Sequence, residues 1–251
     1  MSRVLVIGES CKDVFIYGDV SRLNPEAPVP IITPIKTIFN NGMSSNVVDN
    51  LKSLGITDII HITNDYLFKK TRYVDESYNY ILLRIDENES VERINLDILP
   101  DSSLVDYIII SDYNKGFLEN SDIEYICKKY DAPIFIDTKK PIGDWICNVS
   151  YIKINNTEYQ KNKKYIDSNL DIKTKTIITK GRYGCVHNGI QYPTQEVLIK
   201  DVVGAGDTFL AGLVFSYIQT NSIDQSIKYA NKCSAQVVQR RGVGIINKEE
   251  L

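Results

Sequence analysis

The sequence is poor in the residues that build metal and disulfide sites. It has only two histidines, His61 and His187, which stand far apart along the chain, so a zinc site based on histidine is not expected. Its five cysteines form no Cys-x-x-Cys pair, and an odd, unpatterned set is typical of reduced thiols in the cytosol. We therefore expect a cytoplasmic protein whose cysteines are small buried hydrophobic residues.

Long hydrophobic runs and an excess of charge of one sign are also missing. No apolar run approaches the length of a transmembrane helix, and the run at residues 4–7 is too short for a signal peptide. The 29 basic and 32 acidic residues are interspersed and give a formal net charge of −3, so neither a membrane nor a nucleic-acid partner is expected. With 251 residues, 43% of them hydrophobic, the chain can form one compact domain over residues 1–251.

The most informative stretch is Asp-Val-Val-Gly-Ala-Gly-Asp-Thr at residues 201–208. It follows a short apolar run at 196–200 and precedes a strongly apolar segment at 209–218, an order that predicts a strand, a tight glycine turn and a buried helix. Bare backbone amides at the start of that helix, together with the positive end of its dipole, would favour an anion such as a phosphate. These amides belong to Gly204, Ala205 and Gly206.

Asp207 lies in the first turn of this expected helix and has two possible roles. It can cap the helix, or it can take a proton from a hydroxyl that attacks a phosphate beside it. A close-packed turn without a ligand also stays open on spacing alone. Two other phosphate-binding patterns are excluded, because no Gly-x4-Gly-Lys-Ser/Thr occurs and the dinucleotide pattern would need glycine at Phe209.

The rest of the chain alternates short apolar runs with helical patterns, which predicts an α/β domain with a parallel sheet. Strands are expected at residues 4–7, 59–62, 107–110, 133–136, 151–154 and 176–178, with a hairpin at 185–192. Helices are expected from Ser44 or Ser45, as cap, to Gly55, over 121–130, and over 223–240. Proline-rich β pieces within about 13–40 and 71–86 predict a small side sheet, because proline confines strands to sheet edges.

The pattern Asp-x-x-Gly-Ala-Gly-Asp-Thr-Phe resembles the second signature of the ribokinase-like (PfkB) family of sugar kinases. The resemblance implies a three-layer α/β/α sandwich with a small β-sheet lid, Asp207 as catalytic base, and the glycine-turn amides as an anion hole. Residues 41–55 resemble the first signature, Gly-Gly-x-x-Asn-x-Ala. Val203 and Met43 depart from the residues that the family usually carries, and a helix–strand segment usual after Ile62 is absent.

Further pieces resemble one branch of the family, the heptose 7-phosphate kinase domain of bifunctional ADP-heptose synthesis proteins. They are residues 21–30, Lys70-Thr-Arg, Ser111-Asp-Tyr-x-Lys-Gly and Asp137-Thr-Lys. This resemblance implies that ATP and magnesium are used to phosphorylate C1 of D-glycero-D-manno-heptose 7-phosphate, without the nucleotidyltransferase half. It implies sugar contacts by Asp13, Gly42 and Asn46, and contacts to the sugar phosphate by Arg72 and Lys115.

On the nucleotide side, the resemblance implies that Asn155 and Glu158 act on magnesium, through water, and on the ATP phosphates. Magnesium prefers such oxygen ligands. The matching nucleotide turn contains Thr179, Gly181 and Gly184, with Arg182 in place of the usual acidic residue, and Asn231 would lie beside the adenine. The exposed lid strands predict a homodimer. Two alternatives stay open: a kinase for another sugar, sugar phosphate or nucleoside, and a non-catalytic nucleotide- or sugar-binding protein on the same fold.

Overall fold

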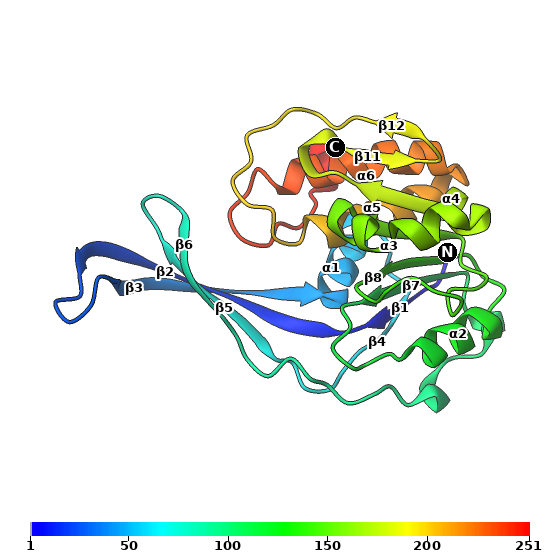
Figure 1. The fold of residues 1–251 in the computed structure, drawn as a ribbon, viewed down its shortest axis with the longest axis horizontal. Coiled ribbons are helices and arrows are strands. Elements are labelled where there is room, and N and C mark those ends of the chain that lie inside the picture. The colour runs from blue at the N-terminus through cyan, green and yellow to red at the C-terminus, as the bar shows by residue number, and fades with distance from the viewer. Residues whose placement is uncertain (1) are drawn as a thin grey trace.

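The computed structural model describes residues 2–251, which form two β-sheets (Figure 1). The larger sheet has eight strands in the order β12-β11-β10-β9-β8-β7-β1-β4. Its strands from β10 to β4 are parallel, whereas β11 and β12 form an antiparallel hairpin at one edge. The strands are β1 (Val4–Gly8), β4 (Ile59–Ile62), β7 (Tyr107–Asp112), β8 (Ile134–Thr138), β9 (Tyr151–Asn155), β10 (Thr176–Thr179), β11 (Cys185–His187) and β12 (Ile190–Tyr192).

Helices cover both faces of this sheet and create two hydrophobic cores. Alternate strand residues face opposite ways, so Ile108 and Ile110 lie in one core while Ile109 lies in the other. The first core packs against α2 (Asn120–Lys129), α3 (Asn156–Ser168) and α4 (Leu170–Lys175). The second packs against α1 (Ser44–Leu54), α5 (Ala205–Thr220) and α6 (Ile223–Val237). The expected three-layer α/β/α sandwich is therefore confirmed.

The smaller sheet is the lid, with strand order β3-β2-β5-β6, and it extends away from the sandwich (Figure 1). Its strands are β2 (Ser10–Leu23), β3 (Pro30–Met43), β5 (Lys69–Asp75) and β6 (Tyr80–Asp86). The sequence predicted short pieces between residues 13 and 40, but β2 and β3 are continuous strands of 14 residues each. Pro30 and Pro34 lie on the edge strand β3, where their missing N–H groups cost no ladder bond.

Four local predictions were wrong. Residues 196–200 form no strand, because the amide of Lys200 bonds to the Val238 carbonyl (2.7 Å) and this run lies against α6 instead of a sheet. Neither serine caps α1. The N-cap of α1 is Met43, and the hydroxyls of Ser44 and Ser45 bond to Gly8 and Ser10, respectively.

Helices α3 and α4 were not predicted, because they bury few apolar side chains. Helix α6 ends at Val237, earlier than predicted.

Within residues 2–251, no helix is both long enough and apolar enough to span a bilayer.

Candidate functional site

Asp207 stands at the first turn of α5 and is held by side chains from two other elements. Its carboxylate is buried, accepts the hydroxyl of Tyr113 at 2.5 Å from the loop after β7, and accepts the amide of Asn46 at 3.0 Å from α1. Gly204 is the N-cap of α5, and no side chain caps this helix. The capping role is therefore excluded, and the carboxylate is held between three segments that only the fold brings together.

The glycine turn lets two side chains approach the start of α5 closely. Gly204 has a φ of 77°, and a β-carbon added there would lie 2.6 Å from the amide nitrogen of Asn46. A β-carbon on Gly206 would lie 2.9 Å from the ammonium of Lys153. Glycine is therefore favoured at 204 by its positive φ and by the close approach of Asn46, whereas a side chain at 206 would push the Lys153 ammonium away from the turn.

The expected anion hole is only partly open. The amide of Ala205 donates to the Val202 carbonyl at 3.2 Å, so this amide is occupied, contrary to the sequence-based expectation. No hydrogen bond to residues 2–251 occupies the amide of Gly206. The positive charge at this end is supplemented by Lys153, a residue that the sequence analysis missed.

Lys153 reaches the turn because of the period of two along β9. Ile152 and Ile154 face the core against α3, so Lys153 faces α5, and it is 4% exposed. Its ammonium pairs with the buried carboxylate of Asp137, at the end of β8, at 2.5 Å. The sequence does contain a signal for Lys153, which is a lysine in the middle of an otherwise apolar strand. A charged side chain in such a strand is buried only when it has a partner of opposite charge.

Asp137 belongs to a row of alternating charges that continues along the strand ends. Lys139 pairs with Asp137 at 3.2 Å and with Glu158 at 2.6 Å. Burial raises the pKa of Asp137, but the ammonium groups of Lys153 and Lys139 bring it below the ordinary value for aspartate. Asp137 is therefore ionised at neutral pH.

At Asp207 the effect of burial on the pKa outweighs the opposing effects of the neighbouring groups. Burial raises the pKa of its carboxyl group to about 6, although the hydrogen bonds from Tyr113 and Asn46 and the charge of Lys153 act in the lowering direction. A carboxylate that titrates close to neutral pH can accept a proton from a hydroxyl more readily than an ordinary aspartate can. Asp207 thus combines a position beside the glycine turn with the basicity that a general base needs.

This pKa predicts an acidic limb in the pH profile of turnover. We expect kcat/KM to fall below about pH 6, because the neutral carboxyl can no longer accept a proton. Tyr113→Phe removes a hydrogen bond that lowers the pKa of Asp207, so the acidic limb of the kcat/KM profile will move to higher pH in this variant. Steady-state kinetics from pH 5 to 9 check both, with Tyr165→Phe, a partly buried tyrosine of α3 bonded to Asp144, as control. An unmoved limb in Tyr113→Phe would contradict the assignment.

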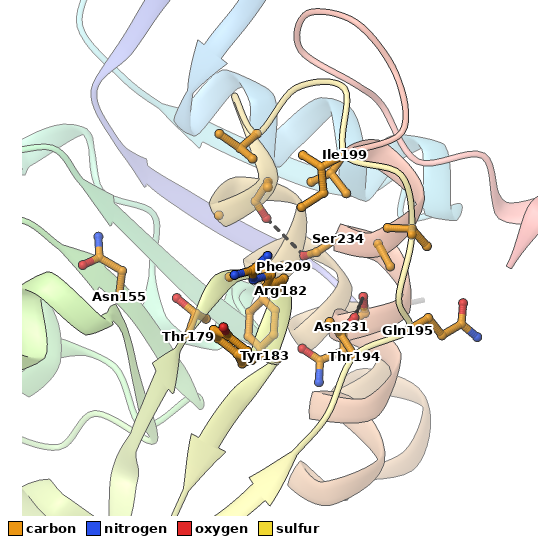
Figure 2. Close-up of a pocket in the computed structure, with 18 of the residues that line it drawn as sticks. Asn155, Thr179, Arg182, Tyr183, Thr194, Gln195, Ile199, Phe209, Asn231 and Ser234 are labelled. Atoms are coloured by element: carbon orange, nitrogen blue, oxygen red, sulfur yellow. Dashed lines mark hydrogen bonds between the residues drawn. The ribbon is translucent and has the colours of Figure 1, made fainter.

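A cavity of about 920 Å³ reaches the glycine turn, where Ala205, Gly206 and Lys153 are among the residues that line it (Figure 2). Thr179, Gly181 and Gly184 line it after β10, and Asn231 and Ser234 line it from α6. The run at 197–199, predicted as part of a strand, supplies apolar side chains to the wall instead. A largely apolar cleft that ends at a helix N-terminus suits a nucleotide, with the base in the cleft and the phosphates at the turn.

Asn231 holds the cavity wall in place. Its amide donates to the carbonyls of Tyr192 at 3.0 Å and Pro193 at 3.4 Å, so it fixes the segment that leads into the apolar run. Gly184 is required at its position, because it has a φ of 76° and a β-carbon would lie 2.1 Å from the Tyr192 carbonyl oxygen. Arg182 lines the same cavity and provides a positive charge where the resemblance gives the family an acidic residue.

Asn155 and Glu158 form the capping box of α3. The side chain of Asn155 accepts the amide of Glu158 at 2.9 Å, and Glu158 accepts the amide of Asn155 at 2.8 Å. Within residues 2–251 there is no cluster of three or more histidine, cysteine or acidic side chains that could bind a metal. The side-chain oxygens of Asn155 and Glu158, at the start of α3, fit magnesium that arrives with ATP and is held through water. They do not fit a cation that the protein would bind alone.

The acceptor side of the site contains Asp13 of β2 and Gly42 of β3. Asp13 is buried and paired with Arg72 of β5 at 2.5 Å. A β-carbon on Gly42 would lie 2.3 Å from an oxygen of Asp13, so this glycine leaves room for the carboxylate. One guanidinium nitrogen of Arg72 is thus engaged with Asp13, and the contact of Arg72 to a sugar phosphate stays a prediction.

Glu9, which the sequence analysis also missed, organises the loop after β7. It is fully buried, and its two carboxylate oxygens accept the amides of Tyr113 at 2.7 Å and Lys115 at 2.8 Å. A carboxylate bonded to backbone amides fixes the loop path. Glu9 thereby directs Tyr113 toward Asp207 and Lys115 toward the lid.

Residues 102–250 match the model of the pfkB family of carbohydrate kinases. The chain belongs to this family. Among solved structures, it is similar to ribokinase from Thermotoga maritima, with a TM-score of 0.75 at 16% identity over 100% of this chain and 98% of that one. Phosphofructokinase-2 from Escherichia coli, in complex with potassium, gives a TM-score of 0.74 at 12% identity over 100% and 97%. These likenesses establish the ribokinase-like fold of this pfkB kinase.

Curated relatives of this pfkB kinase include two proteins named "Bifunctional protein HldE". The protein from Helicobacter pylori strain J99 is 27% identical over 304 positions, which cover 100% of this chain and 66% of that protein. The protein from Bradyrhizobium diazoefficiens is 26% identical and covers 99% of this chain and 62% of that protein. The chain thus spans less than two thirds of their length. Because the alignments exceed its 251 residues, the relatives carry residues in the aligned region that it lacks.

Proposed function

We propose that this pfkB kinase transfers the γ-phosphoryl group of ATP to the C1 hydroxyl of D-glycero-D-manno-heptose 7-phosphate. The observation that carries the proposal is the buried Asp207, with a pKa of about 6, beside the glycine turn between the nucleotide cavity and the Asp13–Asn46 side. The resemblance to heptose 7-phosphate kinase domains and the similarity to HldE proteins support the heptose as acceptor.

In the proposed reaction, Asp207 takes the proton of the C1 hydroxyl as the oxygen attacks the γ-phosphorus in line. The new phosphorus–oxygen bond forms while the bond to ADP breaks. Tyr113 and Asn46 hold the carboxylate in its orientation, and Lys153 and the amide of Gly206 face the charge on the phosphoryl oxygens. Magnesium, held through water near Asn155 and Glu158, would supply positive charge to the ATP phosphates.

The lid supports a homodimer as the proposed assembly, in a cytoplasmic protein of one domain. Its outer strands expose apolar side chains, including Phe39 on β3 (65% exposed) and Leu83 on β6 (53% exposed). Exposed strands with apolar side chains favour pairing with a second copy. Light scattering at micromolar concentration tests this, and a monomer would contradict it.

Two other functions are compatible with the fold. The acceptor of a pfkB kinase could be another sugar, sugar phosphate or nucleoside, or the chain could bind nucleotide and sugar without catalysis. Val203, Met43 and the short connection from β4 to β5 are the departures that favour the second, whereas the intact Asp207 and its glycine turn favour an enzyme.

A substrate panel separates these functions. We expect magnesium-dependent ATP turnover with D-glycero-D-manno-heptose 7-phosphate, and much weaker turnover with the unphosphorylated heptose, ribose, fructose 6-phosphate and adenosine. Coupled detection of ADP provides the measurement, and nucleotide binding by calorimetry confirms that each preparation is folded. Turnover with a different acceptor alone would replace the heptose, and binding without any turnover would favour the non-catalytic protein.

A further inference from the structure

Two lysines near the site share one carboxylate that no step of the reaction uses. Glu89, in the segment after β6, pairs with Lys70 of β5 at 3.0 Å and with Lys115 of the loop after β7. Lys70 is 8% exposed, and its ammonium lies 5.5 Å from the ring centre of Phe68 and 5.8 Å from that of Tyr113. An ammonium enclosed in this way needs an anion to be stable.

The cluster lies one tyrosine ring away from the proposed base. The ring of Tyr113 contacts Lys70, and the hydroxyl of the same residue donates to Asp207. Asp13 is the β2 partner of Lys70 in the lid sheet, and Arg72, which pairs with Asp13, lies two residues further along β5. An acceptor with its reacting hydroxyl at Asp207 and its hydroxyls at Asp13 would therefore extend toward Lys70 and Lys115.

We propose that Lys70 and Lys115 form the subsite for the far phosphate of the acceptor, and that Glu89 occupies this subsite as an internal competitor until a phosphate displaces it. The proposal rests on the proposed function in that the acceptor carries such a phosphate. It adds Lys70 as a specificity residue and gives Glu89 a role in selecting phosphorylated acceptors.

The charges explain why a phosphate displaces Glu89 and a hydroxyl does not. Burial raises the pKa of Glu89, but the hydrogen bonds from Lys115 and Lys70 bring it below the ordinary value, so it is ionised at neutral pH. One carboxylate leaves the two ammonium groups with a net positive charge, whereas a phosphate dianion neutralises them. An uncharged hydroxyl cannot replace an ionised partner of two lysines.

The Glu89 side chain is not needed to hold its own segment in place. The backbone on either side is already bonded, from the Glu87 amide to the Lys69 carbonyl at 3.0 Å and from the Val91 amide to the Lys115 carbonyl at 3.1 Å. Side-chain exposures of 23% for Glu89 and 27% for Lys115 leave part of each side chain in contact with solvent, although the Glu89 Oε1 atom that faces Lys70 is buried. Glu89 can therefore rotate away while its segment stays in position.

Calorimetric titration with inorganic phosphate tests the proposal, with a non-hydrolysable ATP analogue and magnesium filling the nucleotide site. We expect Glu89→Gln to bind phosphate about tenfold more tightly than the unsubstituted protein, because a charge-assisted competitor is lost. We expect Lys70→Met to bind it about tenfold more weakly. Glu92→Gln makes the same chemical change at an exposed position of the same segment and will bind phosphate as the unsubstituted protein does.

Equal phosphate affinities in Glu89→Gln and the unsubstituted protein would overturn the role of Glu89, whatever the acceptor. If Glu89→Gln does not fold, an unchanged affinity in Lys70→Met would overturn the subsite by itself. Absent turnover with the heptose phosphate, combined with tighter phosphate binding by Glu89→Gln, would reject the proposed acceptor and retain the subsite. Turnover combined with the expected affinities would support both, and KM for the phosphorylated acceptor would then fall in Glu89→Gln.

Discussion

Asp207→Asn is expected to lower kcat on the order of a hundredfold or more while the protein still folds. The amide keeps the shape of the side chain but cannot accept a proton at neutral pH. Folding is retained because burial, which raises the pKa of Asp207 to about 6, makes its charged form unfavourable in the native state. Stability therefore falls as the pH rises from the pKa of this carboxyl group in the unfolded chain to its folded-state pKa of about 6, because ionisation opposes folding. The amide of the variant does not ionise, so this loss of stability is removed.

The measurement for Asp207→Asn is ATP turnover together with nucleotide affinity. Asp207 is not among the described residues that line the cavity proposed for the nucleotide, so calorimetry should give the same ADP affinity in the variant and the unsubstituted protein. Loss of turnover with intact ADP binding is the expected pair of results. Near-normal turnover in the variant would contradict the assignment of Asp207 as base.

Lys153→Met is expected to destabilise the protein strongly. It leaves Asp137, 3% exposed, with Lys139 as its remaining ion-pair partner, and breaking a buried pair typically costs about 3–5 kcal/mol. In a domain of this size, that corresponds to a fall in Tm of roughly 10 °C, from about 2–4 °C per kcal/mol. Turnover should also fall, because Lys153 lies against Gly206 at the expected phosphoryl position.

Thermal unfolding checks this expectation with two matched variants. Lys139→Met removes the more exposed partner of Asp137, so its Tm should fall less. Lys153→Met combined with Asp137→Leu removes both charges and should recover much of the lost Tm, because an apolar pair of similar volume is often as stable as a buried ion pair. An unchanged Tm in Lys153→Met alone would show that the pair does not stabilise the fold.

The sequence was sufficient for those parts of the site that depend on local patterns. The glycine turn before α5, the strands of the larger sheet and the β5–β6 hairpin follow from runs of neighbouring residues, so they could be predicted. The run at 196–200 was misread because a strand and a cavity wall both need consecutive apolar residues. Only contacts with α6 distinguish the two, and those contacts are distant in sequence.

The surroundings of Asp207 could not be predicted in this way. Tyr113 approaches it from the loop after β7, and Lys153 reaches the neighbouring Gly206 from the middle of β9. Glu9 acts on Tyr113 across more than a hundred residues of chain. Glu89 lies in a segment without periodicity, and its two lysines meet it only when the lid packs against the sandwich. Such contacts depend on tertiary packing, which a single sequence does not display.

The most direct test of the account is the structure of the product. Phosphorus NMR should follow the unsubstituted protein acting on D-glycero-D-manno-heptose 7-phosphate with ATP and magnesium. The proposed reaction gives one new phosphate signal coupled to the anomeric proton, with the 7-phosphate retained and one ADP formed per product. A new phosphate at any other position, or no product from a folded protein that binds ATP, would contradict it.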